Sequence, residues 1–226
     1  MGIALITGGS GHVGANLVRE LSSRGYEVRC IDFDNDHRAF EGFNVELVKG
    51  NITDISTLDN AFKDVEVVFH TAAVISLDRK DKGLIRSVNV GGTENVCEMS
   101  LRHDVKKLIH FSSVDAFVRE PLEDPLYENR SLVTDPNAVP YDLSKADAQR
   151  IVLEYCDKGL NASIIHPSGI FGPNDFKPAC LDKSSSTLLT KKDLTVSTLD
   201  MTTLMLEIYA KHQLTVLTKE RLSKII

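Results

Sequence analysis

The sequence has no tryptophan, only four cysteines and no long apolar run. The cysteines show neither C-x-x-C spacing nor paired histidines, so we expect reduced thiols and no metal site. No apolar stretch approaches the roughly 20 residues that span a bilayer. The apolar start lacks a basic region and is too short for a signal peptide. These absences predict a cytoplasmic protein that does not insert into membranes.

Basic clusters are also missing from the 226 residues, whose net charge is −6. Lysine and arginine form no block and do not interleave with aromatic residues, so nucleic acid is not an expected partner. The length is sufficient for one sizeable α/β core.

Six short segments rich in valine and isoleucine alternate with helical patterns. The expected strands are residues 3–7, 27–32, 45–50, 65–70, 107–112 and 162–167. Apolar residues recur at helical spacing in residues 12–24, 83–103 and 141–158. Unalternated apolar strands between helices predict an α/β fold, a Rossmann-type doubly wound parallel sheet with helices on both faces.

A glycine-rich turn follows the first expected strand and opens the first helix. Gly8, Gly11 and Gly14 give G-x-x-G-x-x-G, which permits a tight turn and lets backbone approach a diphosphate at the helix N-terminus. Asp32 ends the second strand, where a carboxylate can bind adenosine ribose hydroxyls and repel a 2′-phosphate. NAD is therefore favoured, with NADP as the less favoured alternative because of the nearby Arg38.

Tyr141 and Lys145 are one helical turn apart, directly after Pro140. Positions i and i+4 share a helix face, so the phenol and the ammonium can meet. A nearby ammonium lowers the pKa of a phenol, as a tyrosine acid/base requires. The same spacing also arises by chance on solvated helices, so the pair alone does not define an active site.

Together these features resemble the extended short-chain dehydrogenase/reductase superfamily. This group includes NAD-dependent epimerases/dehydratases, dihydroflavonol-reductase-like enzymes and 3β-hydroxysteroid dehydrogenases. The motifs that carry the resemblance, in order, are TGGSGHVG (7–14), GNITD (50–54), VFHTAA (68–73), NVGGTENV (89–96), HFSSVDAF (110–117), YDLSK (141–145) and HPSGIFGP (166–173). The resemblance covers residues 1–175 and implies an NAD(P)-binding domain that holds the catalytic residues.

The resemblance also implies which residues contact the cofactor. They are Gly8, Gly11, His12, Val13, Gly14, Asp32, Asn51, Ile52, Ala72, Ala73, Asn89, Tyr141, Lys145, Pro167 and Ser168. Asn51, where the family commonly has aspartate, and Ile52 would flank the adenine. Ala72 and Ala73 would approach through backbone. Asn89 resembles the family's structural asparagine, although it could equally be an ordinary helix residue.

The implied catalytic residues are Ser113, Tyr141 and Lys145. Ser112 is the neighbour that could be confused with Ser113, but strand alternation should point the two hydroxyls in opposite directions. By the resemblance, Tyr141 exchanges a proton with a substrate oxygen and Ser113 hydrogen-bonds that oxygen. Lys145 lowers the tyrosine pKa and binds the nicotinamide ribose.

Three functions agree with these motifs. The first is an NAD(P)-dependent oxidoreductase acting on a carbonyl or secondary alcohol of a small-molecule substrate. The second is a nucleotide-sugar epimerase or dehydratase that holds NAD tightly, and the third is a non-catalytic NAD-binding regulator.

The C-terminal part is short for this family. Residues 176–226 are expected to be a remnant of the substrate-binding region, with a loop over 176–199 and an amphipathic helix over 201–212. The resemblance further implies a homodimer through helices 83–103 and 141–158, with Val90, Cys97 and Ile151 as candidate apolar contacts. A monomer with ordinary helix surfaces is the alternative.

Overall fold

The computed structural model describes residues 2–32, 37–124, 126–170 and 172–177. Apart from Phe176 and Lys177, the expected C-terminal region, with its loop and its amphipathic helix, lies outside these residues.

Six parallel strands form one sheet in the order β3-β2-β1-β4-β5-β6. They are β1 (Ile3–Thr7), β2 (Glu27–Asp32), β3 (Val45–Lys49), β4 (Val65–His70), β5 (Lys107–Phe111) and β6 (Ala162–Ile165). The predicted doubly wound sheet is confirmed. Its strand order reverses between β1 and β4, and ligands of such sheets bind at the carboxyl ends of the strands at this point.

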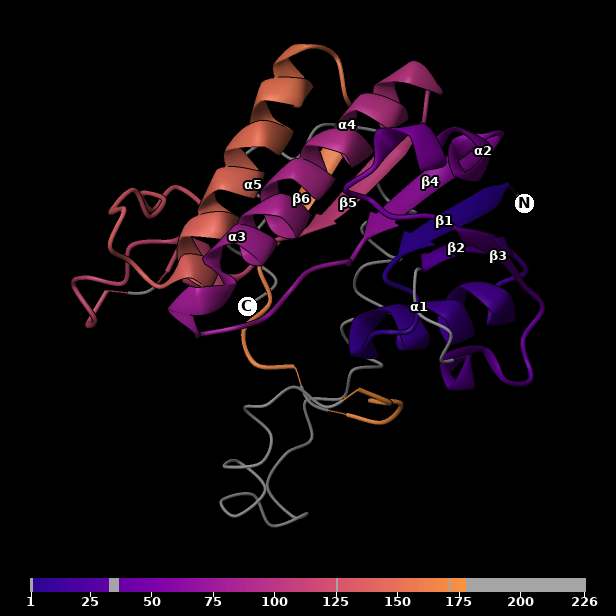
Figure 1. Cartoon of the computed structure of the whole chain (residues 1–226), viewed down its shortest axis with the longest axis horizontal. Coiled ribbons are helices and arrows are strands. Elements are labelled where there is room, and N and C mark those ends of the chain that lie inside the picture. Colours follow the sequence, from indigo (N-terminus) through magenta and orange to yellow (C-terminus); the bar gives the residue numbers. More distant parts are fainter. Residues whose placement is uncertain (1, 33–36, 125, 171, 178–226) are drawn as a thin grey trace.

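Helices cover both faces of the sheet (Figure 1). On one face lies α1 (His12–Ser23), and on the other lie α4 (Gly92–Arg102) and α5 (Pro140–Asp157). Two one-turn helices, α2 (Asp59–Phe62) and α3 (Lys82–Ile85), complete the α-helices of the described residues. The predicted helix 83–103 is therefore α3, a π-helical turn at Arg86–Gly91, and α4 in succession.

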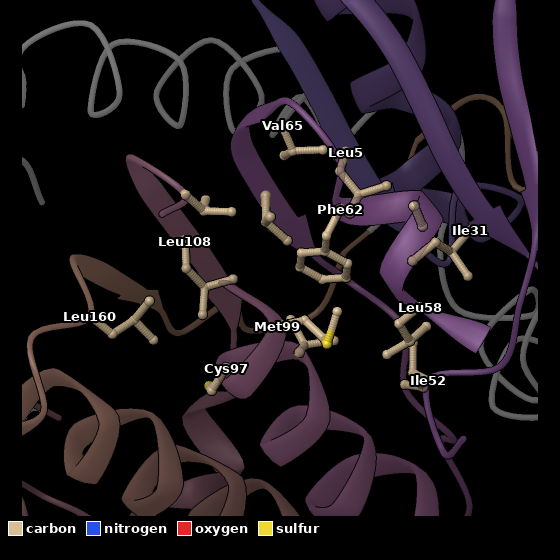
Figure 2. Close-up of a cluster of buried hydrophobic side chains, with 14 of the residues drawn as sticks. Leu5, Ile31, Ile52, Leu58, Phe62, Val65, Cys97, Met99, Leu108 and Leu160 are labelled. Carbon is tan, nitrogen blue, oxygen red and sulfur yellow. The ribbon is translucent and has the colours of Figure 1, made fainter. Parts of the chain in front are cut away.

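Alternate residues of the strands contribute to two separate cores. Ala4 and Ile6 of β1 pack in the core that includes α1, whereas Leu5 packs in the core that includes α2, α4 and α5. Figure 2 shows this second core, where Leu5 and Leu108 approach Phe62. Because both faces of each central strand are buried, the strands read as continuous apolar runs in the sequence.

Two of the three residues proposed as partner contacts are buried within the chain itself. Cys97 belongs to the second core and Val90 is only 7% exposed, so neither presents a surface to another subunit. Ile151 is half-buried. Leu84 of α3, in contrast, is 56% exposed. The π-helical turn holds one residue more than an α-helical turn. The faces of α3 and α4 are therefore rotated relative to each other, and a period of about 3.6 residues counted through both helices does not predict which side chains are buried.

Candidate active site

The glycine-rich turn lies at the carboxyl end of β1. Gly8 has a φ of 73°, and its carbonyl oxygen accepts a hydrogen bond from Gly11 N at 3.1 Å. A Cβ at Gly14 would lie 2.3 Å from this oxygen. The turn closes tightly on α1, whose first N–H groups, from His12 and Val13, have no partner within the helix. This arrangement fits a diphosphate.

Asp32 lies beside this turn at the end of β2. Its Oδ2 accepts a hydrogen bond from the backbone N–H of Ser10 at 3.0 Å. The carboxylate is thus fixed next to the glycines, as required to bind the ribose hydroxyls of a dinucleotide.

The residues proposed for the adenine follow β3. Asn51 is exposed, and its amide oxygen accepts a hydrogen bond from Thr53 N at 3.0 Å. The Ile52 side chain is instead buried in the second core. It packs closely against α4, since a Cβ at Gly92 would lie 2.5 Å from Ile52 Cδ1. Asn51 therefore remains available at the surface, whereas the Ile52 side chain helps to pack α4.

Beyond β4, the small residue Ala72 lies against the glycine turn, and Ala73 follows it, half-buried. Ala72 N is 3.3 Å from Thr7 Oγ1, and a Cβ at Gly8 would lie 2.8 Å from Ala72 Cα. Only small side chains permit this approach between the loops after β1 and β4.

Asn89 lies behind the candidate site, within the π-helical turn. Its Oδ1 accepts from Val74 N at 2.8 Å, and its Nδ2 donates to Val74 O at 3.0 Å and to Ser144 Oγ at 2.9 Å. Ser144 Oγ in turn donates to Tyr141 O at 2.7 Å. Asn89 thus ties the loop after β4 to the first turns of α5.

Ser113 and Tyr141 meet at the carboxyl end of β5. Burial raises the pKa of Tyr141 to about 12, and the neighbouring Ser113 hydroxyl acts in the opposite direction and lowers it. The Asp115 carboxylate, 3.2 Å from Ser113 Oγ, also raises the pKa of Tyr141. Ser112 Oγ instead donates to Gln149 Oε1 at 2.9 Å. Of the two serines, Ser113 is therefore the one beside the phenol.

Lys145 is buried beneath Tyr141. Its Nζ lies 5.9 Å from the centroid of the Tyr141 ring and donates to Phe111 O at 2.8 Å. Burial lowers the pKa of Lys145 to about 8. The expected lowering of the Tyr141 pKa by this ammonium is not found, because Nζ hydrogen-bonds the backbone of β5 and burial of the phenol dominates.

The turn after β6 joins the same edge of the sheet. Pro167 O accepts a hydrogen bond from Val114 N at 3.1 Å, which places this turn directly beside Ser113. Ser168 is exposed next to it.

Gln149 was not identified from the sequence. Its Oε1 accepts from Ser112 and lies 2.8 Å from His166 Nε2, so it links β5 and the turn after β6 to α5. A signal was present: Gln149 is four residues after Lys145 and eight after Tyr141, on the same helix face.

Two histidines form a buried pair under the site. His70 of β4 and His110 of β5 are register partners, with ring centroids 5.3 Å apart. The His70 ring nitrogens contact hydroxyls of Thr7 and Thr93 at 2.7 and 2.9 Å, whereas within the described residues neither nitrogen of His110 has a partner. Burial lowers the pKa of His70 to about 3 and that of His110 well below its ordinary value. No cluster of three metal-ligating side chains occurs in the described chain.

This sheet, with its glycine turn after β1 and with helices on both faces, defines a Rossmann-type domain. The chain belongs to the NAD dependent epimerase/dehydratase family, whose sequence model matches residues 4–202.

Similar curated proteins have several activities. A sterol demethylase protein B of Methylococcus capsulatus is 33% identical over 80% of this chain and 55% of its own length. A 3 beta-hydroxysteroid dehydrogenase/Delta 5-->4-isomerase of Mycobacterium tuberculosis is 34% identical over 77% of this chain and 49% of the relative. A putative UDP-glucose 4-epimerase of Methanocaldococcus jannaschii is 32% identical over 74% of this chain and 56% of its own length.

Solved structures show the same fold. The crystal structure of gox2253 has a TM-score of 0.73 and 33% identity, covering 81% of this chain and 56% of that one. The Thermus thermophilus UDP-glucose 4-epimerase in complex with NAD has a TM-score of 0.64 and 26% identity, covering 73% of this chain and 54% of that one. The chain thus spans about half the length of these proteins. Within its described part, no helix is long and apolar enough to cross a membrane.

Proposed function

We propose that this chain is an NAD-dependent oxidoreductase that interconverts a carbonyl and a secondary alcohol on a small-molecule substrate. The observation that carries the proposal is the position of Ser113 beside the Tyr141 phenol, with the Nζ of the buried Lys145 5.9 Å from the centroid of the phenol ring. These groups lie at the sheet edge where ligands of doubly wound folds bind.

The cofactor assignment rests on the turn after β1 and on Asp32. Gly8 and Gly14 leave no room for a Cβ, and the Asp32 carboxylate is fixed beside Ser10 N. A fixed negative charge at this place disfavours a 2′-phosphate, so NAD is proposed over NADP. The family assignment and the NAD complex of the Thermus thermophilus epimerase support this choice.

Side chains of the protein would carry out the proton transfer that accompanies hydride transfer. Burial keeps Tyr141 protonated at neutral pH, so its phenol can donate to a substrate carbonyl oxygen that Ser113 also hydrogen-bonds. The Lys145 ammonium, held under the ring, would stabilise the negative charge that develops on the phenol oxygen. In the opposite direction the same groups would receive the proton of an alcohol. The nicotinamide, when bound, supplies the hydride donor or acceptor.

A second candidate, a nucleotide-sugar epimerase or dehydratase, uses the same residues. It is favoured by the similarity to the Methanocaldococcus jannaschii and Thermus thermophilus proteins. Such an enzyme would retain NAD through purification and would convert its substrate without net consumption of NADH. An oxidoreductase would consume NADH in proportion to product.

The test compares Tyr141→Phe with the wild-type chain, and Tyr127→Phe, at an exposed tyrosine, is the control. NADH binding is followed by nicotinamide fluorescence. Turnover is followed by NADH consumption with ketosteroid and dihydroflavonol substrates, and by product formation from UDP-glucose in the presence of NAD. Removal of the positioned acid should reduce turnover by roughly 10²–10⁴-fold and leave NADH affinity within about twofold.

Near-normal turnover in Tyr141→Phe would contradict the catalytic assignment. If the wild-type chain bound NADH but turned over no substrate, a non-catalytic NAD-binding role would replace the proposal. Absence of NADH binding would contradict the cofactor assignment itself.

A further inference from the structure

The segment after β6 folds back onto the glycine-rich turn; we call residues 172–177 the strap. Its first contacts are with α1: Pro173 O accepts a hydrogen bond from Asn16 Nδ2 at 3.0 Å and lies 3.1 Å from His12 Nε2. Asn174 Nδ2 donates to Asn16 Oδ1 at 2.9 Å. The orange trace in Figure 1 leaves β6 and passes below the sheet, on the side where α1 lies.

A hydrophobic and cationic contact holds the next part of the strap. Phe176 packs against the core that includes α1. The guanidinium carbons of Arg19 and Arg38 lie 5.6 and 5.8 Å from the Phe176 ring centroid, and Arg38 Nη2 donates to Phe176 O at 3.1 Å. The backbone is thus fixed on both sides of Asp175, and the position of Lys177 follows from it.

Lys177 reaches the glycine turn itself. Its Nζ donates to Ser10 Oγ at 2.6 Å, and Ser10 lies between Gly8 and Gly11. The turn, residues 8–14, contains no lysine or arginine of its own. A cation from a position 167 residues away is therefore delivered to the loop whose backbone would carry the cofactor phosphates.

We propose that Lys177 is a cofactor-binding residue whose ammonium contacts the diphosphate of the bound dinucleotide. A diphosphate carries two negative charges, and backbone N–H groups supply only partial charges, so an ammonium adds a charge-assisted hydrogen bond. The strap closes over the turn and supplies this charge. This inference rests on the proposed function, because it assumes that the dinucleotide binds at residues 8–14.

The experiment measures the dissociation constant for NADH by nicotinamide fluorescence in the full 226-residue chain. Lys177→Gln removes the charge, and Lys177→Arg retains it. Lys63→Gln is the matched control, because Lys63 is exposed and lies just before β4, at the amino-terminal ends of the strands and away from the glycine turn. We expect Lys177→Gln to raise the dissociation constant about fivefold or more, as for loss of a partly exposed charge-assisted bond. Lys177→Arg should stay close to the wild type, and Lys63→Gln should not differ from it.

A second measurement separates contact with phosphate from a purely structural latch. ADP and adenosine are used as competitors of NADH, since only ADP carries the diphosphate. Lys177→Gln should weaken ADP by the same factor as NADH and leave adenosine unchanged. The difference between Lys177→Gln and the wild type should also shrink between about 50 and 500 mM salt, because exposed charges are screened.

The outcomes distinguish the two proposals. Tight NADH binding by the wild type with an unchanged Lys177→Gln overturns the role of Lys177 and leaves the proposed function intact. Equal weakening of ADP and adenosine also overturns it, because the strap would then only support the turn. A wild-type chain that binds neither NADH nor ADP overturns both proposals.

Discussion

Tyr141 and Lys145 share one face of α5, and burial moves their pKa values apart. The pKa of the phenol rises to about 12, whereas that of the ammonium falls to about 8. In the ligand-free chain the lysine therefore loses its proton before the tyrosine does. Lys145 thus sets the charge of the site in the range where the enzyme would work.

This ordering predicts the pH dependence of carbonyl reduction. Lys145 is charged below about pH 8, where it can stabilise a developing phenolate, and neutral above that pH. Turnover should therefore fall as pH rises through about 8. Lys145→Arg keeps its charge to a higher pH, so its alkaline decline should move upward by at least one pH unit. An alkaline limb that is identical in Lys145→Arg would show that another group controls it.

The buried histidines predict a loss of stability in acid. The pKa of His70 is about 3 in the folded chain against 6.5 for an ordinary histidine, so the unfolded chain binds more protons between these values. Stability is complete above about pH 6.5, and each such histidine lowers the free energy of unfolding by up to about 1.4 kcal/mol per pH unit below it. Urea unfolding midpoints from pH 7.5 to pH 4.5 measure the effect.

His110→Leu isolates one of these groups. Because the variant no longer titrates at this position, its urea unfolding midpoint should fall less between pH 6.5 and pH 4.5 than that of the wild type. At pH 7.5 the midpoint should change little, since within the described residues the His110 ring nitrogens have no hydrogen-bond partner to lose. His37→Leu, at an exposed histidine, should keep the wild-type slope. Equal slopes for the wild type and His110→Leu would contradict the assignment.

At the scale of elements, the turn between β1 and α1 tolerates no side chain. In Gly14→Ala a Cβ would lie 2.3 Å from Gly8 O, so the turn must open; we expect NADH affinity to fall more than tenfold and the melting temperature to drop. Gly83→Ala in α3 is the control, because its Cβ meets nothing within 4 Å and alanine favours a helix. Calorimetry and fluorescence titration compare them, and similar losses in both variants would contradict the steric argument.

Strands and long helices could be predicted from the sequence because their signal is local. Apolar runs located each strand to within two residues of its ends, and residues 12–24 and 141–158 became α1 and α5. The π-helical turn could not be predicted, since it depends on tertiary contacts such as those of Asn89 with Val74. Its extra residue explains why Val90 was proposed as a surface contact, although it is buried.

The candidate site follows the same division. Ser113, Tyr141 and Lys145 could be proposed from the sequence because each lies in a short motif, and the structure places them close together at the carboxyl ends of the strands. Gln149 and Lys177 were missed because their partners are distant in sequence. The contact of Lys177 with Ser10 depends on the path of the chain after β6, which no local pattern encodes.

At the scale of the whole molecule, we propose a homodimer through the outer face of α5. Leu153 on this helix is 48% exposed, although its neighbour Val152 is buried in the second core. Leu153→Arg should halve the mass measured by light scattering at micromolar concentration, because a charge at an apolar contact opposes association. Leu122→Arg, at a loop residue, is the control. A monomeric mass for the wild type would refute the dimer.

The two edges of the sheet differ in how they would meet another extended chain. The β3 edge carries Glu46 and Lys49, and charged side chains on an edge strand oppose further pairing. The β6 edge, Ala162–Ile165, has no charged residue, and among the described residues no strand pairs with its outer side. Any extended segment that joins this sheet, whether from the same polypeptide or during aggregation, should therefore add at β6 and leave β3 as the permanent border.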